Sequence, residues 1–296
     1  MIPQPLAILE RYYGYSQFRQ GQKEVIESIL SGRDALAIMP TGSGKSICYQ
    51  VPAIAMEGIT LVISPLISLM KDQVTFLNQA GVRAAYFNSS LTPRQMSAAM
   101  YNAKQGIYKM IYVAPERLFT EVFLDFARHT PISLLAVDEA HCISQWGHDF
   151  RPSYTRIFEF VEQLPKRPVV AAFTATATRQ VEQDILTQLQ LRDPYRMTTG
   201  FDRKNLYFAV ERPYDKTDYI LQYVRRYPEK SGIVYCNTRK SVDELCEELN
   251  SHGVSALRYH AGLSDQERLE NQEASLFDQN RVMVATNAFG MGIDKS

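Results

Sequence analysis

The stretch PTGSGKS at residues 40–46 decides how the fold is interpreted. An apolar run, Ala35–Met39, precedes it and is typical of a strand buried on both faces. A segment with helical character, Lys45–Met56, follows it. Glycines between a strand and a helix let backbone N–H groups turn inward around phosphate oxygens, and the helix N-terminus adds positive potential. The stretch therefore predicts a phosphate-binding loop.

Two side chains of this loop are expected to do chemistry. Lys45 would reach the β- and γ-phosphates of a nucleoside triphosphate, and the hydroxyl of Ser46 would hold Mg²⁺. The usual pattern has a glycine where Met39 stands, so a plain glycine- and serine-rich turn is the alternative interpretation. The residues expected to contact the nucleotide here are Thr41, Gly42, Ser43, Gly44, Lys45 and Ser46.

An acidic pair follows another apolar run. Asp138 and Glu139 come directly after Leu134–Val137. In parallel sheets, ligands bind at the carboxyl ends of the strands. We expect Asp138 to hold Mg²⁺ together with Ser46, and Glu139 to polarise the attacking water. Alone, the pair could be a solvated acidic loop, but downstream of a phosphate-binding loop it predicts hydrolysis of a nucleoside triphosphate.

Short apolar runs alternate with helical segments, which predicts a parallel sheet covered by helices. The runs lack polar alternation, as expected of strands buried on both faces. The expected strands are Ala35–Met39, Thr60–Ser64, Ala84–Phe87, Met110–Val113, Leu134–Asp138 and Val169–Thr174, and the expected helices include Lys45–Met56, Ser68–Ala80, Pro93–Gln105 and Arg179–Leu189.

The alternation stops near residue 196 and then restarts, which predicts a second α/β unit. We assign residues 1–195 to the first domain, the polar segment 196–213 to a linker, and residues 214–296 to the second domain. The second domain is expected to be incomplete, because the sequence ends just after a strand and a loop. Its expected helices are 216–227, 241–252 and 265–278, and its expected strands are 232–236, 256–259 and 281–286.

Composition excludes some classes of protein. The chain has 296 residues, of which 45% are hydrophobic and 22% charged, as in an ordinary globular protein. Its 32 basic and 32 acidic residues balance, so a basic coat for unselective polyanion binding is excluded, although a local basic groove is not. No apolar run approaches the roughly 20 residues of a membrane span, and no membrane partner is expected.

The four cysteines form no C-x-x-C pair. Their spacing fits neither a zinc site nor a disulfide framework, so we expect no zinc in this chain and a reducing, intracellular compartment. The cysteines are Cys48, Cys142, Cys236 and Cys246.

An aromatic-rich segment, CISQWGHDFRP at residues 142–152, directly follows the acidic pair and holds the only tryptophan. Trp146 and Phe150 can stack on unpaired bases, and Arg151 can add charge or a cation–π contact. A buried aromatic cluster is the alternative, but residues 147–149 are too polar for a core.

Taken in order, the motifs resemble those of RecQ-type DNA helicases in helicase superfamily two, from about Tyr13 to the last residue. The resemblance implies two RecA-like P-loop domains, the second incomplete. It implies ATP and Mg²⁺ as cofactors, single-stranded and partly duplex DNA as partners, and 3′ to 5′ movement in repair and recombination. It rests on GYSQFRQGQ (14–22), SPLISLMKDQ (64–73), VAPERL (113–118), residues 142–152, FTATAT (173–178), YCNTR (235–239), YHAGL (259–263) and ATNAFGMGIDK (285–295).

The resemblance also assigns roles to residues outside the phosphate-binding loop. Tyr15 and Arg19 would flank adenine, and the Gln22 amide would pair with its edge. His141 joins Lys45 and the acidic pair among the catalytic residues, and Asp294 joins the nucleotide contacts. Read without the family, the segments at 64–73 and 113–118 are plain loops and the one at 173–178 is an ordinary strand end. The expected DNA contacts are Ser64, Ser68, Lys71, Arg117, Trp146, His148, Phe150, Arg151, Asn237, Thr238, His260 and Thr286.

Three interpretations of function stay open at this point. The first is a DNA helicase motor, located in the bacterial cytoplasm with the nucleoid or in a eukaryotic nucleus. The second is an RNA helicase of the same superfamily. The third is a fragment that binds ATP and DNA without efficient unwinding, because the family's later arginine motif, zinc module and winged helix are expected to be missing. A small-molecule kinase would not explain ordered motifs in both halves.

Overall fold

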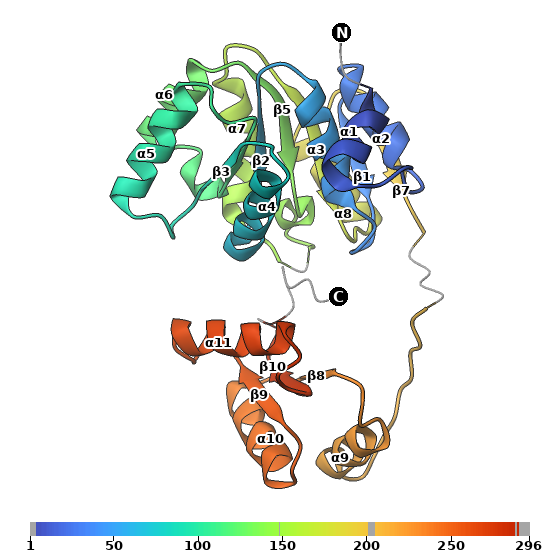
Figure 1. Cartoon of the computed structure of the whole chain (residues 1–296). Coiled ribbons are helices and arrows are strands. Elements are labelled where there is room, and N and C mark those ends of the chain that lie inside the picture. The colour runs from blue at the N-terminus through green and yellow to red at the C-terminus, as the bar shows by residue number, and fades with distance from the viewer. Residues whose placement is uncertain (1–3, 148, 201–204, 288, 290–296) are drawn as a thin grey trace. The chain divides into compact units, whose positions relative to one another are not determined.

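The computed structural model describes residues 4–147, 149–200, 205–287 and 289, and the chain forms two compact units. The first unit covers Met1–Arg203 and the second Lys204–Ser296 (Figure 1). Each unit is an α/β structure with its own parallel sheet, as the sequence predicts. Within the described ranges, no helix is both long and apolar enough to cross a membrane.

A seven-stranded sheet forms the centre of the first unit, in the order β3-β4-β2-β5-β6-β1-β7. Every pair of neighbouring strands is parallel, so all the carboxyl ends lie along one edge. The strands are β1 (Ala35–Ile38), β2 (Ile59–Ile63), β3 (Ala84–Phe87), β4 (Met110–Val113), β5 (Ile132–Val137), β6 (Val169–Thr174) and β7 (Tyr195–Thr198).

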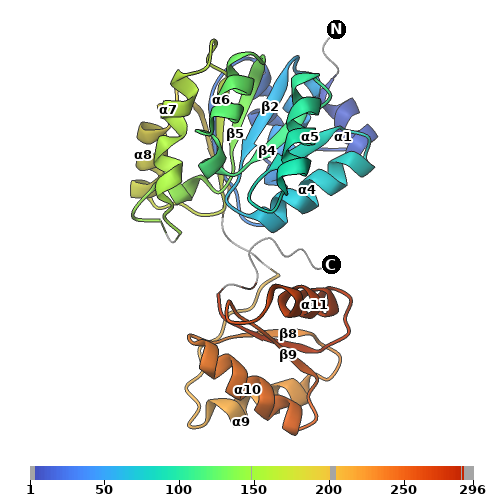
Figure 2. The ribbon, with the colours of Figure 1, turned by 90° about the vertical axis from the view of Figure 1, so that its left-hand side faces the viewer.

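Helices cover both faces of this sheet, as Figure 2 shows. Side chains of α2, α3 and α4 pack on one face, and those of α5 to α8 pack on the other. Helix α1 lies against α3. The helices are α1 (Pro5–Tyr13), α2 (Gln22–Leu30), α3 (Lys45–Ala55), α4 (Ile67–Gln79), α5 (Pro93–Lys104), α6 (Glu121–Arg128), α7 (Ile157–Glu162) and α8 (Arg179–Gln188), with short 3₁₀ turns η1 (Pro115–Arg117), η2 (Ala140–Ile143) and η3 (Pro152–Arg156).

Strand β5 shows why the apolar runs lack polar alternation. Leu134 and Ala136 enter one core cluster, while Leu135 and Val137 enter the cluster on the opposite face. Successive side chains of a strand point to opposite faces, so a strand covered on both sides needs apolar residues at every position. All six predicted strands of the first unit are confirmed to within two residues.

Strand β7, at the edge of the sheet, is not among the strands predicted from the sequence. Its residues alternate between half-buried and exposed, and Arg196 lies within it, so it reads as a polar connector. The structure pairs Tyr195 with Ala35 of β1. The first residues of the segment assigned to the linker therefore belong to the first sheet.

The second unit has a three-stranded parallel sheet in the order β8-β10-β9. Apolar side chains of α10, including Val242 and Leu249, pack against Val282 and Val284 of the central strand β10. All six predicted elements are present with slightly shorter or shifted ends. They are α9 (Lys216–Arg226), β8 (Gly232–Tyr235), α10 (Arg239–Ser251), β9 (Ala256–Tyr259), α11 (Asp265–Leu276) and β10 (Val282–Ala285).

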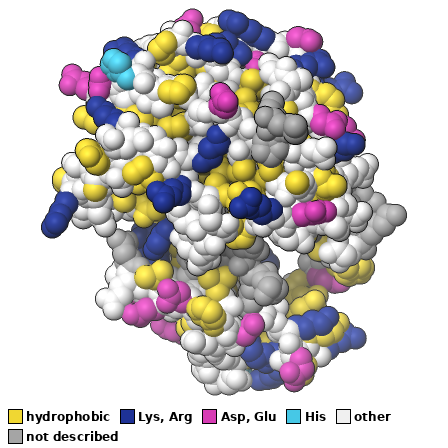
Figure 3. Space-filling view, turned by 45° about the horizontal axis from the view of Figure 1, so that its top comes forward, with side chains coloured by type: hydrophobic (Ala, Val, Ile, Leu, Met, Phe, Trp, Pro, Cys, Tyr) yellow, Lys and Arg dark blue, Asp and Glu magenta, His cyan; other side chains and the backbone are white. Residues whose placement is uncertain are grey.

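The surface agrees with the balanced charge of the chain. Figure 3 shows basic and acidic side chains interspersed with uncharged ones over one face of the first unit, without a continuous basic coat on that face.

One buried carboxylate ties the amino ends of the strands together. Asp34, 2% exposed, accepts hydrogen bonds from the backbone N–H groups of Val170 (2.9 Å) and Arg192 (2.7 Å). The Arg167 guanidinium donates two further hydrogen bonds to the Asp34 carboxylate, at 3.0 and 2.6 Å. These bonds connect β1, β6 and the segment before β7.

Replacing this carboxylate should destabilise the first unit. Asp34→Ala leaves the largely buried Arg167 without its counter-ion, so the free energy of unfolding should fall by about 3–5 kcal/mol. Urea denaturation followed by circular dichroism measures the change. Glu159→Ala breaks an exposed pair with Arg156 and should change the stability little, because solvent screens such pairs. A loss from Asp34→Ala as small as that of the control would contradict the assigned role.

Candidate nucleotide site and neighbouring loops

The phosphate-binding loop lies between β1 and α3. Its entry is held at Met39, whose backbone N–H donates to the carbonyl of Thr174 on β6 (2.9 Å). Gly42 and Gly44 have φ angles of 79° and 84°, a region that strongly favours glycine. Lys45 begins α3, and its Nζ donates to the carbonyl of Met39 (3.2 Å). The lysine is thereby folded back over the loop, where a bound phosphate would sit.

The methionine at the usual glycine position has a packing role. Met39 is fully buried, and its Sδ lies 3.8 Å from the Cys48 Sγ in α3. Burial raises the pKa of the Cys48 thiol to about 12, so it stays protonated. Met39 therefore fills the space beneath the loop, while the turn itself depends on the two later glycines.

Gln22, expected at the adenine edge, holds the phosphate-binding loop in this structure. Its Nε2 donates to the carbonyls of Ser43 and Gly44, both at 3.1 Å, and its Oε1 accepts from the backbone N–H of Arg19 (2.9 Å). The Arg19 guanidinium donates to the carbonyl of Gly42 (2.5 Å). The segment at residues 14–22 and the phosphate-binding loop therefore form one connected structure.

The remaining groups around the loop differ in exposure. Tyr15 is 50% exposed, as a base-stacking ring could be, and Thr41 is also exposed. The Ser43 hydroxyl is buried and has no hydrogen-bond partner among the described residues. A Cβ atom on Gly44 would displace the Gln22 amide from the loop, and the positive φ of Gly44 favours glycine at this position.

The acidic pair lies at the carboxyl end of β5. The Asp138 backbone N–H donates to the carbonyl of Ile63 (2.8 Å), and the Tyr154 hydroxyl donates to the carbonyl of Asp138 (2.9 Å). Glu139 has a φ of 47°, an uncommon conformation for a residue with a Cβ. Burial, with Glu139 nearby, raises the pKa of the Asp138 carboxyl to about 7, and Lys45 opposes this rise.

These groups fit a divalent cation. Asp138 is a buried carboxylate beside a second carboxylate, and its raised pKa means that the surrounding positive charge is insufficient. A cation there would favour the ionised form, and hard cations such as Mg²⁺ prefer oxygen ligands. Ser46 in the first turn of α3 supplies the other oxygen that the sequence predicts.

His141 connects the acidic pair to β6. Its Nδ1 lies 2.8 Å from the Thr174 Oγ1 and 3.3 Å from a carboxylate oxygen of Glu139. The Thr174 hydroxyl donates its only proton to the carbonyl of Thr176 (3.1 Å), so His141 Nδ1–H is the donor to Thr174. The imidazole thus positions Glu139 and joins it to the segment at residues 173–178.

The aromatic segment combines an exposed tip with a fixed base. Trp146 is 75% exposed, and Phe150 is half-buried. The Ser144 hydroxyl donates to Asp184 on α8 (2.6 Å) and accepts from the backbone N–H of Trp146 (3.1 Å). Asp184 is not among the predicted site residues, because an acidic residue in a helix carries no special sequence signal. The exposed tryptophan overturns the buried-cluster alternative for that side chain.

The Arg151 side chain is 30% exposed, and its guanidinium forms hydrogen bonds within the protein. Its guanidinium pairs with Asp149 (3.0 Å) and donates to the carbonyl of Pro65 (2.9 Å). The residue expected to contact DNA therefore links the aromatic segment to the loop after β2. His148 lies outside the described residues.

The loops after β2 and β4 are neighbours, because these strands pair. The Ser64 backbone N–H donates to the carbonyl of Val113 (3.3 Å), and its buried hydroxyl has no partner within the described part of the chain. Ser68 and Lys71 are exposed on α4, and Arg117 is half-buried in η1. The structure therefore groups these four residues along the edge that carries the phosphate-binding loop.

In the second unit, the expected residues also follow strand ends. Asn237 is exposed after β8, while the Thr238 hydroxyl accepts from the Ser241 backbone N–H (3.1 Å) and caps α10. Thr286 is half-buried after β10. Asp294 is outside the described residues.

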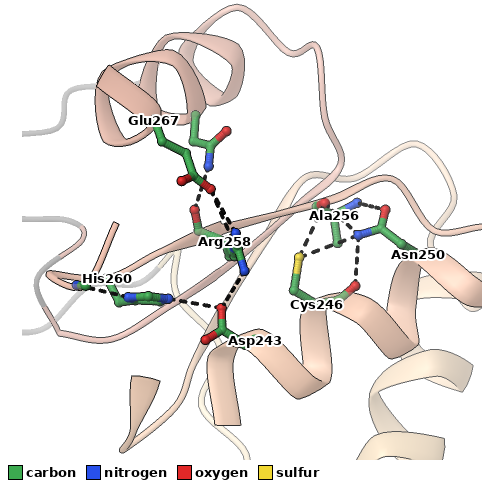
Figure 4. A network of polar contacts seen from close by, with 9 residues as sticks. Asp243, Cys246, Asn250, Ala256, Arg258, His260 and Glu267 are labelled. Atoms are coloured by element: carbon green, nitrogen blue, oxygen red, sulfur yellow. Dashed lines mark hydrogen bonds and ion pairs between the residues drawn. The ribbon is translucent and has the colours of Figure 1, made fainter. Parts of the chain in front are cut away.

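His260 is buried after β9 and is engaged within its own unit (Figure 4). Its Nδ1 accepts from the Gly262 backbone N–H (3.1 Å), so Nε2 carries the proton and donates to Asp243 (3.1 Å). Arg258 pairs with the same carboxylate (2.9 Å) and with Glu267 on α11 (3.1 Å). His260 therefore shapes the loop after β9 and has no ring nitrogen left for DNA.

Family comparisons agree with this geometry. Residues 19–184 match the DEAD/DEAH box helicase model, and residues 215–296 match the helicase conserved C-terminal domain model. The chain is 49% identical over its whole length to an ATP-dependent DNA helicase RecQ of Bacillus subtilis, of which it covers 50%. It is 46% identical to an ATP-dependent DNA helicase RecQ of Pasteurella multocida, over 98% of this chain and 46% of the relative. The chain thus spans about half the length of these relatives.

Solved structures share the fold at low sequence identity. The helicase Lhr of Mycobacterium smegmatis, bound to single-stranded DNA and AMP-PNP, has a TM-score of 0.73 and 19% identity, over 99% of this chain and 43% of Lhr. The helicase MrfA bound to DNA has a TM-score of 0.76 and 16% identity, over 99% of this chain and 45% of MrfA. The chain belongs to the DEAD/DEAH box helicases and, within them, to the RecQ family.

The raised pKa of Asp138 predicts a pH-dependent cost in the protein free of nucleotide and metal. The unfolded carboxyl titrates near about 3.9, so folding becomes less favourable as the pH rises from there to about 7. Asp138→Asn should therefore raise the melting temperature at pH 8, and the gain should shrink toward pH 5. Thermal melts in a chelating buffer measure the difference.

Asp125→Asn is the control for this experiment. Lys104 lowers the pKa of the exposed Asp125 carboxyl, so its amide variant should gain nothing at pH 8. An Asp138→Asn gain that does not change with pH would contradict the assigned titration.

Proposed function

We propose that this chain is the ATP-dependent motor core of a DNA helicase. It would couple ATP hydrolysis to 3′ to 5′ movement along single-stranded DNA and to unwinding of partly duplex DNA. Repair and recombination, in the compartment that holds the DNA, are the expected context. The two RecA-like domains of this proposal are the two compact units, and β7 (Tyr195–Thr198) belongs to the first domain rather than to the linker.

One observation carries the proposal. The edge of the first sheet that holds the phosphate-binding loop also carries an exposed tryptophan, in a segment joined to the nucleotide site by short contacts. His141 touches Glu139, and the same 3₁₀ turn leads into the segment that presents Trp146. A nucleotide site and a base-stacking side chain so placed suit an enzyme whose hydrolysis responds to a bound strand.

The residues suggest how hydrolysis is supported. Lys45 and the backbone N–H groups of the loop bind the phosphates, and Ser46 and Asp138 would hold Mg²⁺, which neutralises developing negative charge. Glu139, positioned by His141, orients the attacking water. The strand would be held by backbone contacts from the loops after β2 and β4 and by stacking on Trp146.

The relatives favour DNA over RNA as the nucleic acid. The two bacterial proteins described above are named DNA helicases. A mimivirus relative with 39% identity is named a putative ATP-dependent RNA helicase, so RNA is the competing candidate. Lhr and MrfA, which share the fold, were solved with DNA.

Steady-state ATP hydrolysis tests the proposal directly. Turnover should rise with single-stranded DNA more than with RNA of the same sequence. Lys45→Ala should reduce turnover at least about 100-fold, because it removes a charge from the transferring phosphate. Greater stimulation by RNA would contradict the choice of DNA. ATP and DNA binding without turnover would favour the fragment that binds both and hydrolyses poorly.

Trp146→Ala should weaken binding of single-stranded DNA. Loss of one stacking ring corresponds to about 1–3 kcal/mol, so the dissociation constant should rise roughly 5- to 160-fold. Fluorescence anisotropy of a labelled oligonucleotide measures it. The matched control is Tyr101→Ala, which removes a 67% exposed ring from α5 and should leave the affinity unchanged. Equal effects of the two variants would refute the role of Trp146.

A further inference from the structure

A buried glutamine follows the phosphate-binding loop on the same helix. Gln50 lies five positions after Lys45 in α3, which is about 8 Å along the helix axis. It is 1% exposed, so its amide is removed from solvent. No chemistry of the nucleotide site needs a polar group there, and an apolar residue would be expected in a helix packed on a sheet.

The amide of Gln50 makes three hydrogen bonds to three different elements. Its Nε2 donates to Gln73 Oε1 on α4 (2.8 Å) and to the Tyr112 hydroxyl on β4 (2.8 Å). Its Oε1 accepts from the Tyr13 hydroxyl at the end of α1 (2.9 Å). Both amide protons and one oxygen lone pair are used, so the position of Gln50 is fixed relative to all three neighbours.

Each partner lies beside a segment already assigned to the nucleotide or to the strand. Tyr13 precedes the segment at residues 14–22, whose Gln22 and Arg19 hold the phosphate-binding loop. Gln73 shares α4 with Ser68 and Lys71. Tyr112 lies on β4, directly before the turn that carries Arg117.

The neighbouring residue on α3 strengthens this arrangement. Tyr49 is buried, and its ring packs on Phe173 of β6, with centroids 5.3 Å apart. Phe173 precedes Thr174, which contacts His141. Helix α3 is thus fixed at its middle to the elements whose carboxyl ends form the site.

We propose that Gln50 is a positioning residue that couples the nucleotide site to the strand-binding loops after β2 and β4. This inference rests on the proposed function. Phosphate binding at the N-terminus of α3 displaces the helix, and the Gln50 amide carries that displacement to α4 and β4. The reverse coupling must be equal, because linkage between two binding sites is reciprocal.

The test measures ATP hydrolysis of the full chain with and without single-stranded DNA. Gln50→Leu and Gln73→Leu should change the KM for ATP without DNA by less than about twofold. Both should reduce the stimulation of kcat by saturating DNA about 3- to 30-fold, the range for residues in a coupling network. The double variant should lose no more than either single variant, because both break the same link.

Asn78→Leu is the matched control on α4. Asn78 forms two hydrogen bonds with the backbone of Ala84 and none with α3. Its substitution should lower the melting temperature and leave the stimulation intact. If Gln50→Leu does not fold, Gln73→Leu and Tyr112→Phe, which removes only a hydroxyl, are judged by the same criteria.

Hydrogen exchange supplies a readout that a purely structural role would not change. A non-hydrolysable ATP analogue should alter the exchange of residues 67–79 in the wild-type chain and not in the Gln73→Leu variant. The inference is overturned if the variants only melt earlier while DNA stimulation persists, or if the two single losses multiply in the double variant. A wild-type chain that DNA does not stimulate would refute the proposed function itself, and the inference with it.

Discussion

Helices cover both faces of the seven-stranded sheet, so a charged side chain finds solvent or a ligand only at a strand end. This constraint confines the reactive and ligand-binding groups to the strand ends. The parallel strands bring the phosphate-binding loop, the acidic pair and the loops after β2 and β4 to a single edge, although they are far apart in the sequence. The interior supplies rigidity, and the edge supplies polar groups that can bind phosphate, metal and bases.

Two buried aspartates show how this fold separates structural from functional charge. Asp34, at the amino ends of the strands, is satisfied by Arg167 and two backbone N–H groups. Asp138, at the carboxyl ends, faces a second carboxylate, and its pKa is raised to about 7. The first stabilises the fold, whereas the second has a stability cost that a bound cation would offset.

Two glutamine side-chain amides hold the elements around the nucleotide site in place. Gln22 binds the carbonyls of the phosphate-binding loop, and Gln50 joins α3 to α4 and β4. An amide can donate and accept at once without carrying charge, so it can bridge several buried elements at a smaller desolvation cost than an ion. Nucleotide binding at the loop would therefore act on a connected set of elements.

The sequence by itself determined the two α/β units, most strand positions and the residues of the phosphate-binding loop and acidic pair, because these depend on local patterns of apolar runs and glycines. The edge strand β7 was not predicted, because its polar residues resemble those of a linker. Only the tertiary structure decided that Arg151 and His260 bind within the protein, that Asp184 anchors the aromatic segment, and that Gln50 meets Gln73 and Tyr112. Such contacts join residues distant in the chain, and their partners carry no sequence pattern until the sheet brings them together.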